Sequence, residues 1–186
     1  EAPLRPRFHD FHVLTGGPGS GKSTLLDHLE RAGFARSTEA GRAVIQDQVA
    51  IDGPALPWRD RALFAELMLA AEIRSYLAAL QTGAGPVFFD RGVPDVVGYL
   101  RLEGLGVPSH IRAAARTFRY NPRVFVAPPW PEIYRHDAER RQDADTARRT
   151  YVSMVNTYRG LGYTLVELPK DSVAARAAFI VERLGP

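Results

Sequence analysis

Short apolar runs alternate along this chain with longer stretches in which apolar residues recur every three or four positions. Apolar runs of strand length lie at residues 11–15, 34–37, 87–90, 123–127 and 163–168. Helical periodicity is found at about residues 21–32, 39–48, 59–81, 94–102, 109–118, 146–159 and 172–184. Such an alternation is typical of parallel strands, because each crossover between them usually contains a helix. The pattern therefore predicts an α/β fold with a doubly wound, parallel, five-stranded sheet.

The longest helical stretch, residues 59–81, is apolar over much of its surface. One stripe is predicted at Leu63, Leu67, Ala70, Arg74 and Leu77, and Phe64, Met68, Ala71 and Tyr76 widen the apolar surface beside it. We expect much of this helix to be buried, because a helix that is apolar nearly all round normally packs on several sides.

Composition narrows the possible classes of protein. The 186 residues carry a formal net charge of +3 and include no cysteine. The absence of cysteine excludes disulfides, thiol catalysis and cysteine-ligated zinc. No apolar run reaches the roughly 18 residues of a membrane span. Residues 1–10 lack the apolar core of a signal peptide, so we expect a cytoplasmic protein. Acidic residues interrupt the densest basic stretch, residues 135–149, so we expect no nucleic-acid partner.

The first apolar run leads directly into a glycine-rich segment that fits G-x-x-x-x-G-K-[ST], the phosphate-binding P-loop. Its residues are Gly16, Gly17, Pro18, Gly19, Ser20, Gly21, Lys22, Ser23 and Thr24. Glycines let successive backbone N–H groups point at phosphate oxygens, and the following helix adds its positive N-terminal end. Lys22 is expected to reach the β- and γ-phosphates, and the Ser23 hydroxyl to bind Mg²⁺.

A carboxylate ends the apolar run at residues 87–90. Strand ends meet at one edge of an open α/β sheet, so Asp90 should lie beside the P-loop and help hold Mg²⁺. The alternative is that Asp90 caps the following helix. Arg91 follows directly, and an Asp-Arg pair at this place occurs in P-loop nucleoside and nucleotide kinases. Arg91 is either a phosphate-contacting group or part of a structural ion pair.

The acceptor side of a kinase-like site is predicted at Glu39, just after the second apolar run. There an acidic residue could accept the proton of a substrate hydroxyl, although a helix-terminal acid could also simply stabilise the helix. Arginines of a lid over about residues 130–146 could contact the transferring phosphoryl group. The candidates are Arg135, Arg140 and Arg141, whose interleaved acids also fit a solvated helix.

Four segments together resemble a known family. "VLTGGPGSGKSTLL", "STEAGRAVI", "VFFDRGVPDVVGYL" and "GYTLVELP" resemble the bacterial AAA-domain family of predicted P-loop ATPases. That family is similar to the ribosylnicotinamide kinase domain of the bacterial NAD-synthesis regulator. The resemblance covers about residues 11–184. It implies a P-loop NTPase fold of the nucleoside and nucleotide kinase type, with ATP or GTP and Mg²⁺ at the P-loop.

Three functions remain open from the sequence. The first is a kinase-like phosphotransferase acting on a small metabolite or nucleoside, the second is an ATPase or GTPase with water as acceptor, and the third is a nucleotide-binding regulatory module. The base-reading motif N-K-x-D is absent from the sequence, which favours ATP over GTP. We expect residues 1–186 to form a single P-loop domain, with an N-terminal extension at residues 1–10.

Overall fold

A five-stranded parallel sheet forms the centre of the protein. The computed structural model describes residues 6–130 and 138–185, and side chains from residue 144 onward in the second range. The strands are β1 (Phe11–Gly16), β2 (Ala35–Arg36), β3 (Val87–Asp90), β4 (Arg123–Ala127) and β5 (Thr164–Glu167). Their order is β2-β3-β1-β4-β5, and every pair is parallel. The predicted α/β fold with a parallel five-stranded sheet is confirmed.

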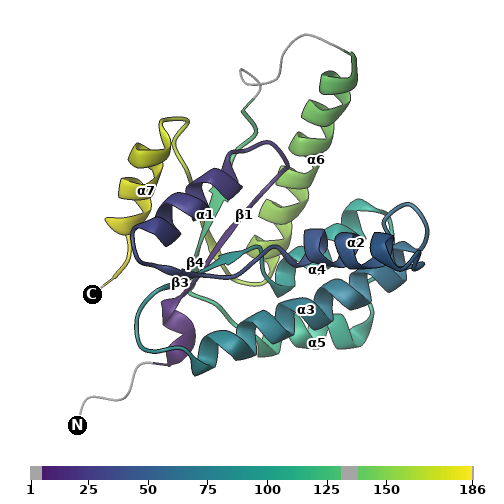
Figure 1. Cartoon of the computed structure of the whole chain (residues 1–186), viewed down its shortest axis with the longest axis horizontal. Coiled ribbons are helices and arrows are strands. Elements are labelled where there is room, and N and C mark those ends of the chain that lie inside the picture. Colours follow the sequence, from purple (N-terminus) through teal and green to yellow (C-terminus); the bar gives the residue numbers. More distant parts are fainter. Residues whose placement is uncertain (1–5, 131–137, 186) are drawn as a thin grey trace.

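Helices cover both faces of the sheet, as a doubly wound fold requires (Figure 1). A short 3₁₀ turn, η1 (Arg7–Asp10), precedes β1. The helices are α1 (Lys22–Arg31), α2 (Ala40–Ala50), α3 (Arg61–Gln81), α4 (Val93–Leu102), α5 (Ser109–Thr117), α6 (Ala138–Gly160) and α7 (Val173–Val181). Among the residues described, no helix combines the length and apolar character needed to cross a membrane.

The two faces of β1 supply the two halves of the core, because side chains alternate along a strand. Leu14 points to one face and packs in a cluster with α1 and α7, which includes Leu26 and Ile180. Phe11 and Val13 point to the other face and pack with residues of α3, α4, α5 and α6.

The predicted apolar stripe of α3 is wrong. Leu63 and Leu77 are 38% and 48% exposed, and Ala70 and Arg74 are also exposed. The buried face carries Phe64 and Tyr76, which were predicted beside the stripe, together with Ala65, Leu69, Glu72 and Ala79. The helical period of apolar residues could not identify the buried face, because α3 is apolar nearly all round. Packing against α2 and α4 determines which face is buried.

Helix α6 begins at Ala138, eight residues before the predicted start at residue 146. Part of the predicted lid-like segment is therefore helical. Ala, Glu, Arg and Gln dominate residues 138–142 and are strong helix formers, so high charge does not prevent a helix there. Helix α7 ends at Val181, three residues earlier than predicted.

The topology brings the sequence motifs to one edge. The P-loop follows β1, Glu39 follows β2, and Asp90 and Arg91 end β3. Because the strands are parallel, all three segments leave the sheet at its carboxyl edge, where open α/β sheets bind ligands.

Candidate active site

The P-loop between β1 and α1 has the curled backbone that phosphate binding requires. Gly19 and Gly21 have φ angles of 70° and 79°, in the left-handed region that favours glycine. At Gly17, an added Cβ atom would collide with the carbonyl oxygen of Ala147 in α6. The Ser20 hydroxyl donates to the Gly17 carbonyl at 2.8 Å and closes the turn. The loop therefore presents backbone N–H groups beside the positive end of α1, which suits an anion.

Helix α7 supports this loop from outside. Arg176 is only 2% exposed, and its Nη1 donates to the Ser20 carbonyl at 2.7 Å. Its Nε donates to the Pro169 carbonyl at 2.7 Å, and the ring of Trp130 lies 5.2 Å from the guanidinium carbon. Sequence reasoning missed Arg176 because it lies 156 residues from Ser20, outside any motif.

Asp90, predicted to lie beside the P-loop, is in direct contact with Lys22 of that loop. The Lys22 Nζ donates to Asp90 Oδ1, and both side chains are buried. Arg36 Nη2 lies 3.8 Å from Asp90 Oδ2, and the Asp90 backbone N–H donates to the Ser37 hydroxyl at 3.0 Å. Burial lowers the pKa of Lys22, and the nearby Arg91 charge lowers it further, outweighing the opposite effect of Asp90 and Glu39. Asp90 is thus the junction of α1, β2 and β3.

Arg91 occupies a strained position that aims it at two carboxylates. Its φ angle is 68°, which is uncommon for a residue with a Cβ atom. Its Nε lies 3.4 Å from Glu39 Oε1, and its Nη1 lies 3.4 Å from Asp95 Oδ1. Such strain persists where the surroundings fix the residue, and it clusters at functional sites.

Glu39 carries the charge that a proton acceptor needs. Burial alone would raise the pKa of Glu39, but the positive charges of Arg91, Lys22 and Arg42 together lower it below its ordinary value. The carboxyl group is therefore ionised at neutral pH, and it accepts the hydrogen bond from Arg91.

A network that sequence reasoning missed holds Arg91 in place. Asp95 is buried in the first turn of α4, and its carboxylate accepts from the Thr15 hydroxyl at 2.5 Å and the Tyr158 hydroxyl at 2.6 Å. It also accepts from the Gly92 backbone N–H at 2.8 Å. The available signal was an acidic residue in the first turn of the predicted helix, where a carboxylate can accept from the backbone N–H before the helix.

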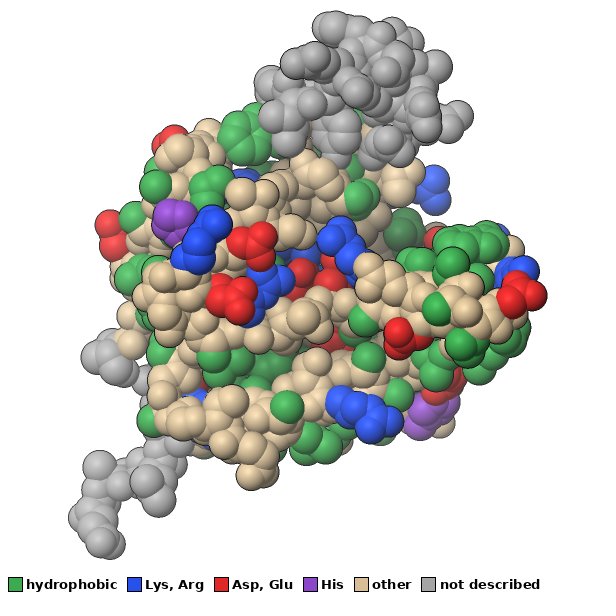
Figure 2. Space-filling model, in the orientation of Figure 1, with side chains coloured by type: hydrophobic (Ala, Val, Ile, Leu, Met, Phe, Trp, Pro, Cys, Tyr) green, Lys and Arg blue, Asp and Glu red, His purple; other side chains and the backbone are tan. Residues whose placement is uncertain are grey.

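Two cavities meet at the predicted acceptor side. The P-loop cavity, of about 270 Å³, is lined by residues 17–24 together with Glu39, Arg42 and Arg91. The apolar cavity, of about 420 Å³, lies between α2, α3, α4 and α6. Pro18, Glu39, Arg42 and Arg91 line both cavities. Figure 2 shows basic and acidic side chains gathered around a hollow near the centre of this face.

The donor set fits a nucleotide with Mg²⁺. The exposed hydroxyls of Ser23 and Thr24 line the P-loop cavity, which Lys22 also lines. Among the residues described, no group of three or more acidic or histidine side chains could hold a metal by itself. The hydroxyl and carboxylate oxygens of Ser23 and Asp90 are ligands that suit Mg²⁺, which usually takes one or two protein ligands together with phosphate oxygens and water.

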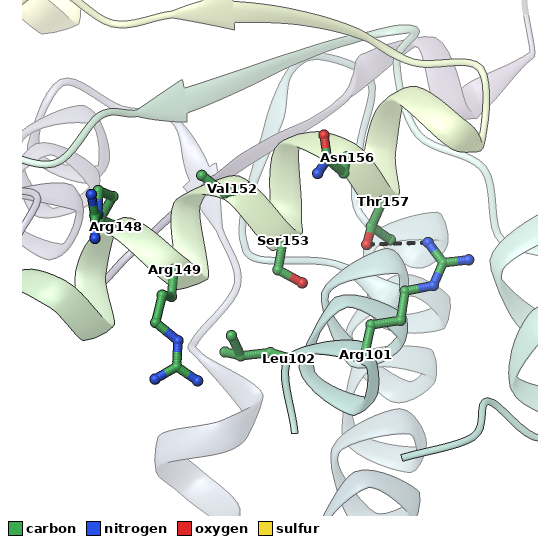
Figure 3. Close-up of a pocket in the computed structure, with 8 residues that line it drawn as sticks. All are labelled: Arg101, Leu102, Arg148, Arg149, Val152, Ser153, Asn156 and Thr157. Atoms are coloured by element: carbon green, nitrogen blue, oxygen red, sulfur yellow. Dashed lines mark hydrogen bonds between the residues drawn. The ribbon is translucent and has the colours of Figure 1, made fainter. Parts of the chain in front are cut away.

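The predicted lid arginines cannot be placed. Arg135 lies outside the described residues, and Arg140 and Arg141 lie in α6 but their side chains are outside the described part. Figure 3 shows that Arg148 and Arg149 instead lie along an outer groove of about 540 Å³ between α4 and α6. Among the residues described, this outer groove shares no lining residue with the P-loop cavity, and it shares Leu102 with the apolar cavity.

Solved structures share the fold across almost the whole chain. The NadR protein in complex with NR matches with a TM-score of 0.67 at 18% identity, covering 94% of this chain and 48% of that protein. This chain therefore spans about half the length of NadR. A deoxyadenosine kinase from M. mycoides matches with a TM-score of 0.65 at 13% identity, covering 94% and 98%. A thymidylate kinase from Ehrlichia chaffeensis matches with a TM-score of 0.60 at 12% identity, covering 94% and 98%.

These likenesses establish the fold of P-loop nucleoside and nucleotide kinases. A search of the curated proteins finds no significant match. A search against protein families matches an AAA domain over residues 11–176. The resemblance expected from the sequence is therefore confirmed, and this chain belongs to the AAA-domain family.

Proposed function

We propose that this protein is a phosphotransferase that moves the γ-phosphoryl group of ATP, bound with Mg²⁺, to a hydroxyl group of a small metabolite or nucleoside. The observation that carries the proposal is the meeting of the P-loop cavity and the apolar cavity at Glu39 and Arg91. A hydrolase needs room only for water beside the phosphate. A separate apolar cavity that opens at the proton acceptor suits an organic acceptor instead.

Each predicted site residue has a role in this reaction. ATP with Mg²⁺ supplies the phosphoryl group and neutralises charge on the phosphates. Backbone N–H groups of the P-loop and Lys22 bind phosphate oxygens, and Ser23 and Asp90 hold Mg²⁺. Asp90 contacts Lys22, so metal binding requires the carboxylate to be shared or the lysine to turn to phosphate. These roles rest on the P-loop motif and on the positions of the side chains.

Glu39 and Arg91 act on the acceptor side. The acceptor oxygen forms a bond to the γ-phosphorus, the bond from phosphorus to the β–γ bridging oxygen breaks, and the hydroxyl proton passes to Glu39. Arg91 fixes the Glu39 carboxylate and offsets negative charge near the transferring group. Arg135, Arg140 and Arg141 remain predicted contributors from the lid.

Phosphate transfer to a panel of hydroxyl compounds tests the proposal. The protein is incubated with Mg²⁺ and either ATP or GTP, together with ribonucleosides, deoxyribonucleosides and ribosylnicotinamide, and products are identified by mass. We expect one class of compound to gain a phosphoryl group. We expect Glu39→Gln to lower kcat by about 10²- to 10⁴-fold, the usual range for a general base, with nucleotide binding retained.

The alternatives give different outcomes. Phosphate release with no phosphorylated compound would favour an ATPase or GTPase. Tight nucleotide binding without turnover, and a Glu39→Gln variant that matches the parent, would favour a regulatory module.

A further inference from the structure

The apolar cavity has the character of a binding site for a flat organic group. Phe64 and Tyr99 meet edge to face in its wall, with ring centroids 5.4 Å apart. Met68, Val96 and Met154 line the same cavity. Mostly apolar walls with a few polar groups are typical of small-molecule sites, in which the polar groups set orientation and specificity.

Glu72 is an unpaired carboxyl group in this wall. It lines the apolar cavity from α3 and is only 3% exposed. Within the described part of the chain, Glu72 has no hydrogen bond and no ion pair, whereas the neighbouring Asp95 accepts three hydrogen bonds from uncharged donors. Burial raises the pKa of Glu72 well above its ordinary value, and the charge of Asp95 adds to this effect. The protein therefore holds a desolvated polar group where a ligand would meet it.

The charges around the cavity disfavour a phosphorylated acceptor. Arg91, which is partly exposed, already faces the carboxylates of Glu39 and Asp95. Arg42 is exposed at the edge that both cavities share. A phosphate monoester would bring about two negative charges to a cavity that four carboxyl groups and two arginines already line. Like charges at close range in a buried site oppose binding.

We propose that Glu72 is a specificity-determining residue whose carboxyl group hydrogen-bonds a polar group of an unphosphorylated, hydroxyl-bearing acceptor. This inference rests on the proposed phosphotransfer. A protonated carboxyl both donates and accepts a hydrogen bond, so it matches a hydroxyl group, which does the same. A site built to hydrogen-bond a substrate group discriminates strongly against compounds that cannot pair with it.

Paired compounds and three variants test this role. Each nucleoside of the panel is offered beside its own 5′-monophosphate, and KM is measured separately for the accepted compound and for ATP. We expect the nucleoside to be phosphorylated and its monophosphate to be rejected. Glu72→Met should raise the acceptor KM by about tenfold or more, because the hydrogen bond is lost. Glu72→Gln, which keeps a donor and an acceptor, should stay within about threefold.

Stability measurements separate this role from a structural one. Glu72→Met replaces an unpaired buried polar group by an apolar one of similar shape, so its melting temperature should equal or exceed that of the parent. If Glu72→Met fails to fold, Glu72→Asp tests the role instead, because its side chain is one methylene shorter and should also raise the acceptor KM.

The ATP KM should stay unchanged in all variants. Arg74→Gln, on the exposed face of α3, is the control.

The outcomes are distinct. An unchanged acceptor KM in Glu72→Met, or equal use of nucleoside and monophosphate, would overturn the role of Glu72 and leave the phosphotransferase intact. Phosphate release without any phosphorylated compound would overturn the proposed phosphotransfer, and the role of Glu72 with it.

Discussion

Two buried carboxyl groups line the apolar cavity, and their surroundings differ at the level of single atoms. Asp95 accepts hydrogen bonds from Thr15, Gly92 and Tyr158, so its desolvation is offset. Glu72 has no such donor among the described residues. Asp95 therefore serves the fold around Arg91, whereas the Glu72 carboxyl faces the cavity, where the proposed acceptor would meet it.

The raised pKa of Glu72 makes stability depend on pH. In the folded protein Glu72 keeps its proton well above about pH 4.3, the ordinary value at which the unfolded chain releases it. Unfolding therefore releases a proton between these two pKa values, so stability falls as pH rises through that window, by at most about 1.4 kcal/mol per pH unit. Glu72→Gln cannot ionise and should be more stable than the parent by an amount that grows from pH 5 to pH 8.

Urea unfolding of both proteins at pH 5 and pH 8 measures this growth. Asp47→Asn, which removes an exposed carboxyl of α2, is the control. An equal stability difference at the two pH values would show that Glu72 ionises alike in the folded and unfolded chains.

At the scale of elements, α4 and α6 pack closely at Gly98, where a larger residue would displace the buried Met154 side chain. An added Cβ atom at Gly98 would lie 2.5 Å from the sulfur of Met154, and the Ser153 hydroxyl donates to the Gly98 carbonyl at 2.8 Å. Alanine normally stabilises a helix interior by about 1 kcal/mol relative to glycine. Here overpacking should dominate, and Gly98→Ala should lower the free energy of unfolding by about 1–3 kcal/mol.

A second glycine of the same helix pair provides the comparison. Gly160 at the end of α6 has no atom within 4 Å of an added Cβ. Gly160→Ala should leave stability unchanged or slightly raised in the same denaturant titration. A Gly98→Ala variant as stable as Gly160→Ala would mean that α4 and α6 can move apart without cost.

Sequence patterns predicted the positions of helices and strands better than the buried faces of the helices. Strands with continuous apolar runs, such as Val87-Phe88-Phe89, were predicted to within a residue or two, because a short apolar run bounded by turn residues is typical of a buried parallel strand. The buried face of α3 was predicted wrongly. Yet Leu69, Glu72 and Tyr76 lie at helical spacing, so an acid within an apolar stripe was a usable signal for the carboxyl group in the cavity.

At the scale of the whole molecule, the parallel sheet joins segments that are far apart in the chain. Sequence reasoning expected Asp90 beside the P-loop because strand ends share an edge, and the structure has Lys22 in contact with it. The same reasoning could not predict that Arg176 supports the loop or that α3 closes the apolar cavity. Those contacts depend on how helices pack over the sheet, which no local motif encodes.

Nucleotide binding should therefore stabilise the molecule as a whole, because the P-loop is packed between the sheet, α6 and α7. A ligand at 100 times its Kd adds about 2.7 kcal/mol to the free energy of unfolding. For a chain of this size, that corresponds to a rise of roughly 5–11 °C in melting temperature. We expect ATP with Mg²⁺ to give such a shift, and EDTA to remove most of it if Ser23 and Asp90 hold the metal.

Lys22→Ala should abolish this shift, because the loop then lacks its only side-chain charge. The sequence contains one other lysine, Lys170, which is exposed in the loop after β5. Lys170→Ala is thus a matched control, and it should keep the full shift in the same thermal unfolding experiment. Lys22→Ala should also melt below the parent without nucleotide, because among the residues described it leaves the buried Asp90 with Arg36, at 3.8 Å, as its remaining ion-pair partner. A Lys22→Ala protein that still gained 5 °C or more from ATP with Mg²⁺ would place the nucleotide elsewhere than the P-loop.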